Sequence, residues 1–183
     1  MPEPSPYDLL APRLWPQGDR PNVWAVLDCA RDEMVWSTLY ASTMPYECLY
    51  AGALHPKLER AAPYLVQLEF DDRQTIRLLN RSWGQNWGIF LRAGLSMTPL
   101  RKHLRTFLRV TGPMGKPLVF RYYDPRVMRV FLPTCSARQL DQLFGPIECI
   151  VTEDASARQL LEFRLDGQRQ RLQTAQVELA SRP

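Results

Sequence analysis

The sequence predicts an α/β domain with a mixed β-sheet of about six strands, covered by helices and ending in a C-terminal β-hairpin. Three observations predict this class. Short apolar runs of strand length recur along the chain, and stretches with helical spacing and N-cap residues separate them. Near the C-terminus, an Asp-Gly pair lies between two alternating runs, which is typical of a hairpin. The length of 183 residues suits one compact unit with a short appendage.

The N-terminal third predicts a lead-in, three strands and one helix. Residues 1–21 contain six prolines and are expected to be extended, yet their leucines and Trp side chain are too apolar for a free tail and predict docking on the domain or on a partner. Residues 22–27 form a continuous apolar strand, and apolar positions at helical spacing follow over 31–41. Two further short strands are expected at 47–51 and 63–68.

The middle of the chain alternates between helices and strands. An Asp71-Asp-Arg-Gln capping pattern opens a helix over 71–79, and residues 87–91 form the next strand. A Thr-Pro pair opens a helix over 98–110, which stops at a Gly-Pro pair. A fifth strand is expected at 118–123, directly before an Asp-Pro helix start.

The C-terminal part predicts one more helix and three strands. A Ser136-Ala-Arg-Gln capping box opens a helix that ends at Gly145, and residues 147–151 form a sixth strand. Residues 161–172 alternate in polarity around Asp166-Gly167, which predicts a hairpin with a type I′ turn. A helix across 156–165 is the alternative.

Three segments therefore make up the predicted organisation. A Pro-rich lead-in covers 1–21, an α/β domain covers 22–155, and a hairpin with a tail covers 156–183. The sequence contains no internal repeat and no low-complexity tract.

The charge is modest, uneven and carried mainly by arginine. The formal net charge is +4, and only three of the 23 basic residues are lysines. Residues 1–100 carry 9 basic and 11 acidic residues, whereas residues 101–183 carry 14 and 8. Such asymmetry is compatible with a nucleic acid, an anionic membrane or an acidic protein partner. Arginine suits bidentate contacts with protein carboxylates, so a protein-docking surface is the preferred interpretation.

Neither a metal site nor a cofactor site is expected. The two histidines are far apart, and the four cysteines include no C-x-x-C pair and no zinc spacing, so they read as buried free thiols. The sequence has no glycine-rich phosphate loop. The N-terminus lacks the features of a signal peptide, and no apolar stretch approaches 18 residues, so a soluble cytoplasmic protein with no membrane contact is expected.

The helix predicted over 98–110 contains the clearest charge pattern. Arg101, Arg105 and Arg109 recur every four residues on one face, away from an apolar stripe. Like charges at this spacing disfavour an isolated helix by about 0.2–0.5 kcal/mol per pair. We therefore expect an anion to offset them. The face is either solvated or paired with intramolecular carboxylates, or it docks on an acidic partner surface.

The segment 118–129 is the most distinctive in the chain. Arg121 lies among apolar and aromatic neighbours, and a charged side chain there needs a carboxylate or carbonyl partner. One interpretation is a structural ion pair with Asp124, Asp28 or another carboxylate. The other is an exposed Arg/Tyr surface for a partner, formed by Arg121, Tyr123 and Arg126.

At these residues the chain resembles a known family. The block Phe120-Arg-Tyr-Tyr-Asp-Pro-Arg-Val127, supported by the segments 63–68, 87–92 and 100–108, is similar to the type VI secretion effector adaptors catalogued as domain of unknown function 4123. The similar blocks span roughly 22–150. Arg121, Tyr123, Asp124 and Pro125 match the most recognisable motif, and Asp124, Pro125, Trp87 and Gly88 are expected to be structural.

The resemblance implies a function without catalysis. Members are cytoplasmic chaperones of Gram-negative bacteria that bind a toxic effector and help load it onto the valine–glycine repeat (VgrG) spike protein. It implies no catalytic residues, no cofactor and no small-molecule substrate. The expected mechanism is shielding of an apolar effector segment in a hydrophobic groove, with arginines at its rim.

Two other classes of function stay open as alternatives. The first is an enzyme of unrecognised type that uses Asp28, His55, His103 or a cysteine. The second is a nucleic-acid-binding domain, which the modest charge, the scarcity of lysine and the lack of a known motif disfavour.

Overall fold

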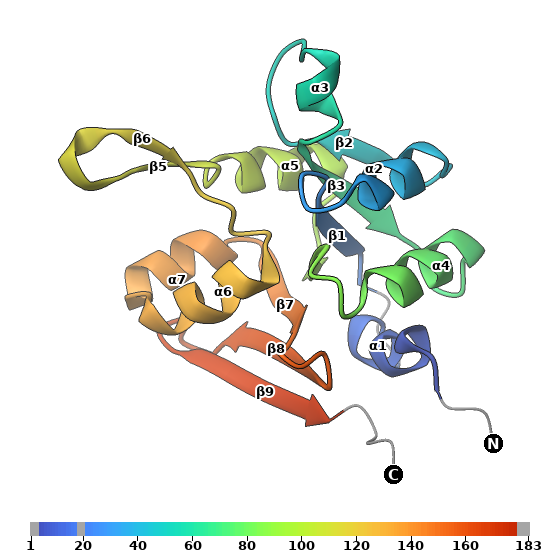
Figure 1. The fold of residues 1–183 in the computed structure, drawn as a ribbon. Coiled ribbons are helices and arrows are strands. Elements are labelled where there is room, and N and C mark those ends of the chain that lie inside the picture. Colours follow the sequence, from blue (N-terminus) through green and yellow to red (C-terminus); the bar gives the residue numbers. More distant parts are fainter. Residues whose placement is uncertain (1–3, 18–20, 179–183) are drawn as a thin grey trace.

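A seven-stranded sheet with helices on both faces forms the body of the protein (Figure 1). The computed structural model describes residues 4–17 and 21–178, so the ends of the predicted lead-in and tail, 1–3, 18–20 and 179–183, lie outside the described residues. In sheet order the strands are β2 (Tyr46–Cys48), β3 (Pro63–Leu68), β1 (Val23–Asp28), β4 (Gly88–Ala93), β7 (Ile147–Glu153), β8 (Gln159–Leu165) and β9 (Leu172–Glu178). The predicted α/β class and the C-terminal hairpin, β8–β9, are confirmed.

Seven α-helices are found among the described residues. They are α1 (Pro6–Leu14), α2 (Glu33–Tyr40), α3 (Pro56–Glu59), α4 (Arg73–Ser82), α5 (Met97–Arg105), α6 (Pro125–Phe131) and α7 (Ala137–Phe144). Within the part of the chain that the structure describes, no helix combines the length and the apolar character that crossing a bilayer requires.

All ladders of the large sheet are antiparallel, whereas a mixed sheet was expected. The connectivity β1-α2-β2-β3-α4-β4 is that of a split β-α-β unit. Helix α2 joins β1 to β2 with β3 between them, and α4 joins β3 to β4 with β1 between them. The strands that each helix connects are therefore parallel but not adjacent.

The two faces of the sheet bury separate apolar cores. Along β1, Val23, Ala25 and Leu27 point into a core that α1, α2 and α4 cover. Trp24 and Val26 point into a second core beneath α5, α6 and α7. Every β1 residue is buried, which explains why this strand is a continuous apolar run in the sequence.

The N-terminal segment forms a helix, whereas an extended segment was expected. Ser5 caps α1 in a reciprocal capping box with Asp8, and Pro6 occupies the first turn, where its missing N–H costs nothing. Leu10 and Leu14 are fully buried against the domain. The expected docking of this segment is confirmed, because proline at a helix start favours the helix that the apolar residues need.

The helix predicted over 98–110 is shorter than expected. Helix α5 ends at Arg105, and a hairpin follows in which β5 (Arg109–Thr111) pairs with β6 (Pro117–Val119). The turn has positive φ at Met114 and Gly115. The strand predicted over 118–123 is therefore confirmed only as far as Val119, and Arg121 does not lie on a strand.

Several smaller features differ from expectation or confirm it. Asp72 caps α4 in place of Asp71, whose φ is +59°. The β8–β9 hairpin has a six-residue connection over 166–171 and not a two-residue type I′ turn, and β8 excludes the alternative helix across 156–165. The short helix α3 was not predicted. The capping box of Ser136 with Gln139 is confirmed at the start of α7.

Candidate functional site

The motif segment, residues 120–126, leads from β6 into α6 and is anchored by two buried tyrosines. Tyr122 and Tyr123 are 2% and 1% exposed, and the Tyr122 hydroxyl donates a hydrogen bond to the Leu104 carbonyl oxygen over 3.0 Å. Burial raises the pKa of both phenols above the ordinary value, so both are neutral at physiological pH. Tyr123, expected on a partner-binding surface, therefore has a packing position in the core.

Asp124 and Pro125 build the start of α6. Asp124 is its N-cap and accepts a hydrogen bond from the Arg126 backbone N–H over 2.9 Å, and Pro125 occupies the first helical position. The Arg126 guanidinium grips the same carboxylate, with Nε 3.0 Å from Oδ1 and Nη2 2.6 Å from Oδ2. Burial opposes ionisation of Asp124, but hydrogen bonds and charge from Arg126 outweigh it and the pKa of Asp124 is lowered.

Arg121 forms an ion pair with Asp28, one of the partners that the sequence suggested. The Arg121 Nη1 atom lies 3.6 Å from Oδ2 of Asp28, at the end of β1. Burial raises the pKa of Asp28, although a hydrogen bond from the Ala30 N–H and the Arg121 charge oppose the rise. We call Asp28, Arg121, Asp124 and Arg126 the arginine–carboxylate cluster.

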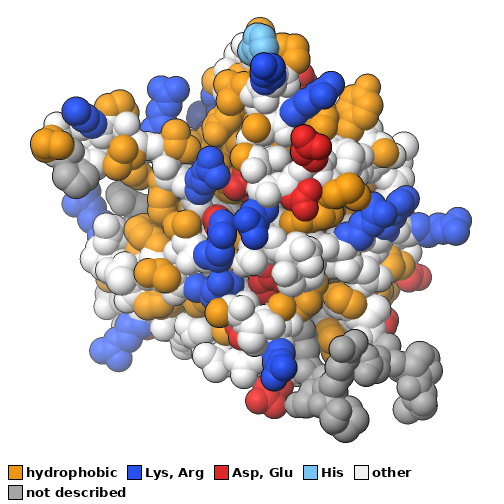
Figure 2. Space-filling model, viewed as in Figure 1, with side chains coloured by type: hydrophobic (Ala, Val, Ile, Leu, Met, Phe, Trp, Pro, Cys, Tyr) orange, Lys and Arg blue, Asp and Glu red, His pale blue; other side chains and the backbone are white. Residues whose placement is uncertain are grey.

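The cluster combines buried carboxylates with accessible guanidinium groups. The Arg121 and Arg126 side chains are 54% and 51% exposed, whereas those of Asp28 and Asp124 are 3% and 8% exposed. Figure 2 shows Lys and Arg side chains with Asp and Glu among them along the middle of the molecule. The ion pair of Arg121 with Asp28 is therefore the structural contact that one interpretation expects. The partner-binding surface stays a prediction, for which the two arginines are accessible and Tyr123 is not.

Trp87 and Gly88 hold β4 against β1. Trp87 is 4% exposed, and its carbonyl oxygen accepts a hydrogen bond from the Asp28 N–H over 2.8 Å. A Cβ atom on Gly88 would overlap the carbonyl oxygen of Val26 and lie 2.9 Å from its carbonyl carbon. Both residues therefore make structural contacts between the two strands.

The predicted stripe of Arg101, Arg105 and Arg109 is not continuous. Arg101 donates from Nε to the Cys48 carbonyl oxygen over 2.7 Å and pairs with Glu47 at 3.2 Å, so it ties α5 to β2. Arg109 lies on β5, beyond the end of α5. The offsetting anion is intramolecular for Arg101, while Arg105 and Arg109 form no ion pair among the described residues.

The β5–β6 hairpin, residues 109–119, projects from the body and exposes apolar side chains (Figure 1). Its exposed fractions are 41% for Val110, 88% for Met114, 50% for Leu118 and 58% for Val119. In Figure 2, hydrophobic and basic side chains share this projection. Two three-residue strands with no packed face are only marginally stable in water, so a covering surface would stabilise them.

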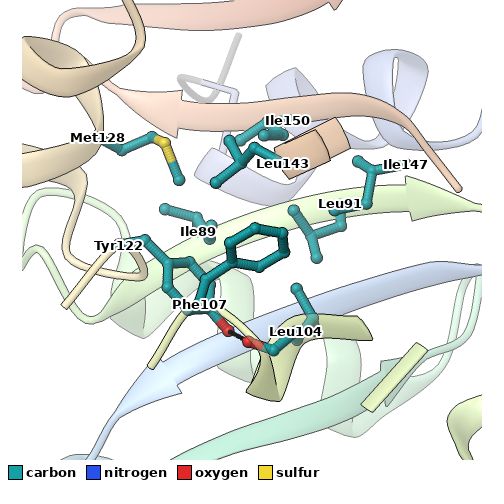
Figure 3. Close-up of a pocket in the computed structure, with 9 residues that line it drawn as sticks. All are labelled: Ile89, Leu91, Leu104, Phe107, Tyr122, Met128, Leu143, Ile147 and Ile150. Atoms are coloured by element: carbon teal, nitrogen blue, oxygen red, sulfur yellow. Dashed lines mark hydrogen bonds between the residues drawn. The ribbon is translucent and has the colours of Figure 1, made fainter. Parts of the chain in front are cut away.

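An apolar cavity lies between the sheet and the helices next to this hairpin. Figure 3 shows side chains of β4, α5, α6, α7 and β7 around it, together with Phe107 and Tyr122 from the segments that precede β5 and α6. Its volume is about 10 Å³, which is near the size of one water molecule. The cavity is a packing gap, and the expected apolar groove for a partner segment is not found at this place.

The residues of the enzymatic alternative include no thiol with a lowered pKa among the described residues, although Asp28 and Cys48 lie near Cys29. Burial raises the pKa of the Cys29 and Cys149 thiols to about 12, so neither forms thiolate readily. His55 caps α3, and His103 lies on α5 with Nε2 2.9 Å from the Leu143 carbonyl oxygen. Among residues 4–17 and 21–178, no group of three His, Cys, Asp or Glu side chains is placed to hold a metal ion.

The structure shows two features that the sequence analysis does not predict, the role of Glu153 and the arginines of α4. Glu153, at the end of β7, is 4% exposed and accepts hydrogen bonds from the backbone N–H groups of Gly84 and Asn86, so it organises the loop before β4. No local pattern indicates this role. Arginines at 73, 77 and 81 form a continuous stripe on α4, and their four-residue spacing could have revealed it.

One comparison with known proteins gives a family match that includes the motif segment. The sequence model described as "Domain of unknown function (DUF4123)" matches residues 23–142, which include β1, the motif segment and most of α7. The chain belongs to the DUF4123 family. No curated protein and no solved structure gives a significant match to this DUF4123 protein.

Proposed function

We propose that this DUF4123 protein is a non-enzymatic cytoplasmic adaptor, which binds a type VI secretion effector and helps load it onto the VgrG spike protein. The motif segment supports the secretion role through its resemblance to effector adaptors. The observation that carries the binding role is the β5–β6 hairpin, which presents four apolar side chains to solvent.

The composition of the hairpin indicates the kind of surface that would cover it. Met114 is almost fully exposed, and exposed contiguous apolar side chains mark interaction sites. Arg109 and Lys116 are exposed on the same hairpin, and Arg105 ends the preceding helix. The complementary surface is an apolar segment of the effector flanked by acidic residues, which the basic groups would orient.

Residues of the motif segment fix the base of the β5–β6 hairpin. Tyr122 fixes α5 through the Leu104 carbonyl, and the backbone N–H of Phe120 donates to the Leu108 carbonyl oxygen over 3.0 Å. These contacts hold the two ends of the hairpin together. A rigid base lowers the entropy that is lost when a partner binds.

Affinity capture with a matched control tests the proposal. Tagged wild type, Met114→Glu and Val130→Glu proteins are expressed in a Gram-negative strain with an active type VI system, and the captured proteins are identified. Val130 is also apolar and 72% exposed, but it lies on α6. We expect wild type and Val130→Glu to recover an effector and VgrG, and Met114→Glu to recover at least tenfold less effector.

Two results would count against the proposal at different levels. Recovery of neither an effector nor VgrG by the wild type would remove the adaptor function. Equal recovery of the effector by Met114→Glu would leave the function in place and move the binding surface away from the hairpin.

A further inference from the structure

The exposed face of α4 carries an arginine stripe that has no carboxylate partner among the described residues. Arg73, Arg77 and Arg81 are spaced by four residues, all three are exposed, and none forms an ion pair among the described residues. Five other arginines are each paired with a carboxylate: Arg101, Arg121, Arg126, Arg164 and Arg169. We call the three unpaired residues the α4 stripe.

The fold does not need this stripe. Helix α4 is held by its buried residues, including Leu78 and Leu79, and contains no acidic residue that could offset the arginines. Like charges four residues apart destabilise a helix by about 0.2–0.5 kcal/mol per pair. The stripe therefore opposes folding slightly, which is expected where a charge serves binding.

A groove of about 260 Å³ lies between α4 and α2 and contains two of the stripe arginines. Arg77 and Arg81 line one side, and the hydroxyl residues Ser37, Thr38 and Ser42 line the other. The Arg81 Nη1 atom is 3.4 Å from Thr38 Oγ1, so the guanidinium reaches across the groove. In Figure 2, Lys and Arg side chains project from the α4 side of the molecule.

The groove has a net positive charge. Among the residues that the structure describes, no carboxylate lines it, and the carbonyl groups at the end of α2 supply only about half a negative charge against two guanidinium groups. A neighbouring hollow does contain Glu69 and Asp72, but Gln74 separates the two spaces. The Gln74 side chain forms that wall by hydrogen bonds of 2.8 and 2.6 Å to Thr43.

We propose that this groove binds a carboxylate side chain in an acidic segment of a protein partner. Guanidinium groups match carboxylates in bidentate geometry, and the hydroxyl groups can donate to the same oxygens. A protein source is favoured over a free anion because Met34 and Tyr40, on the same helix α2, are 46% and 71% exposed. Methionine, tyrosine and arginine are the residue types enriched at protein interfaces.

This surface is separate from the β5–β6 hairpin. The hairpin and α4 project from opposite sides of the molecule in Figure 1. Binding in the groove therefore goes beyond the proposed function, and it would let one chain hold two partner segments at once. A failure at either surface leaves the test of the other intact.

Nuclear magnetic resonance titration of the ¹⁵N-labelled full chain with an octaglutamate peptide tests the groove. We expect amide signals from residues 37–42 and 74–81 to shift in a saturable way. Arg77→Gln/Arg81→Gln should weaken binding at least tenfold. Arg138→Gln/Arg171→Gln, which removes the same charge from exposed positions on α7 and in the β8–β9 connection, should change it less than twofold.

Three results would overturn the inference: unmoved groove signals, equal weakening in the control variant, or inorganic phosphate binding at the groove as tightly as the peptide. Loss of binding through misfolding is excluded by thermal unfolding, because Arg77→Gln/Arg81→Gln should melt at or above the wild-type temperature. If it melts lower, Arg77→Lys/Arg81→Lys keeps the charge and the fold, and should still bind the peptide at least threefold more weakly. Wild-type affinity in that variant would contradict bidentate binding.

Discussion

Asp28 and Arg121 join the end of β1 to the motif segment through an ion pair in which only the arginine is accessible. The carboxylate is 3% exposed and the guanidinium 54%, with 3.6 Å between Oδ2 and Nη1. The buried acid lies next to the Asp124–Arg126 pair. Burial favours the protonated form of both acids, but the pKa of Asp28 is raised, whereas hydrogen bonds and charge from Arg126 leave the pKa of Asp124 lowered. In the arginine–carboxylate cluster, the buried carboxylates of Asp28 and Asp124 thus hold the guanidinium groups of Arg121 and Arg126 at the surface.

The raised pKa of Asp28 predicts a stabilising substitution. An acid whose pKa is higher in the folded state binds more protons there, so it lowers the free energy of unfolding as the pH rises above its usual pKa of about 3.8. Asp28→Asn removes this effect and can keep the oxygen that accepts from Ala30. We expect urea unfolding at pH 7 to show equal or higher stability for the variant, and no advantage at pH 3. A loss of more than about 1 kcal/mol at pH 7 would mean that the Arg121 pair outweighs burial.

The pKa of Asp124 is shifted in the opposite direction to that of Asp28. Its pKa is lowered in the folded state, so its contribution is present above the usual pKa of about 3.8 and is lost as the pH falls through the folded value. Asp124→Asn keeps the N-cap but loses the charge pair with Arg126, and should cost about 1 kcal/mol at pH 7. Asp124→Ala should cost about 1 kcal/mol more. A pH titration of stability in which the Asn variant does not converge with the wild type at low pH contradicts this account.

Gly88 is required by the close approach of β4 to β1. In Gly88→Ala, the new methyl group would overlap the Val26 carbonyl oxygen in the centre of the sheet. We expect a loss of about 3 kcal/mol or more, because backbone must move to admit it. Chemical denaturation measures this loss, and Gly167→Ala, with nothing within 4 Å of its Cβ position, is the matched control. Equal stability of the two variants would show that the strands can separate at little cost.

Substitutions of Arg101 and Arg109 should have different effects, the first on stability and the second on effector binding. Arg101→Gln loses the bond to the Cys48 carbonyl and the pair with Glu47, and should lower the free energy of unfolding by about 1 kcal/mol. Arg109→Gln is exposed on the hairpin and should stay within about 0.5 kcal/mol of the wild type. Effector capture should instead fall in Arg109→Gln and stay unchanged in Arg101→Gln. The reverse pattern would place effector binding at Arg101 and not on the hairpin.

The sequence predicts the fold best where local signals and burial agree. The strands β1 and β3 are apolar runs buried on both faces, and the capping box of Ser136 marks the start of α7 without ambiguity. Strand direction was not predictable, because the split connectivity depends on which strand inserts between two others. The proline-rich start departs from the prediction because Pro6 follows a capping serine, so the same residue that suggests extension favours a helix.

The candidate surfaces were predicted less well than the fold. The Asp28–Arg121 pair was among the partners suggested, since a strand-end carboxylate and an arginine among aromatics both need an opposite charge. The predicted helical stripe of arginines is wrong at Arg109, which lies on a strand. Val110 and Thr111 favour that strand, and the following Gly-Pro-Met-Gly sequence supplies its turn. The groove between α2 and α4 depends on tertiary packing, and only the spacing of the α4 arginines hints at it.

Effector export is the most direct test of the adaptor function. The gene is deleted in a strain with an active type VI system and complemented with the wild type or with Met114→Glu, and the culture supernatant is assayed for effector and VgrG. We expect deletion to abolish effector export while a spike protein is still exported, wild type to restore it, and Met114→Glu to restore less than a tenth. Normal effector export from the deletion strain would contradict the proposed function.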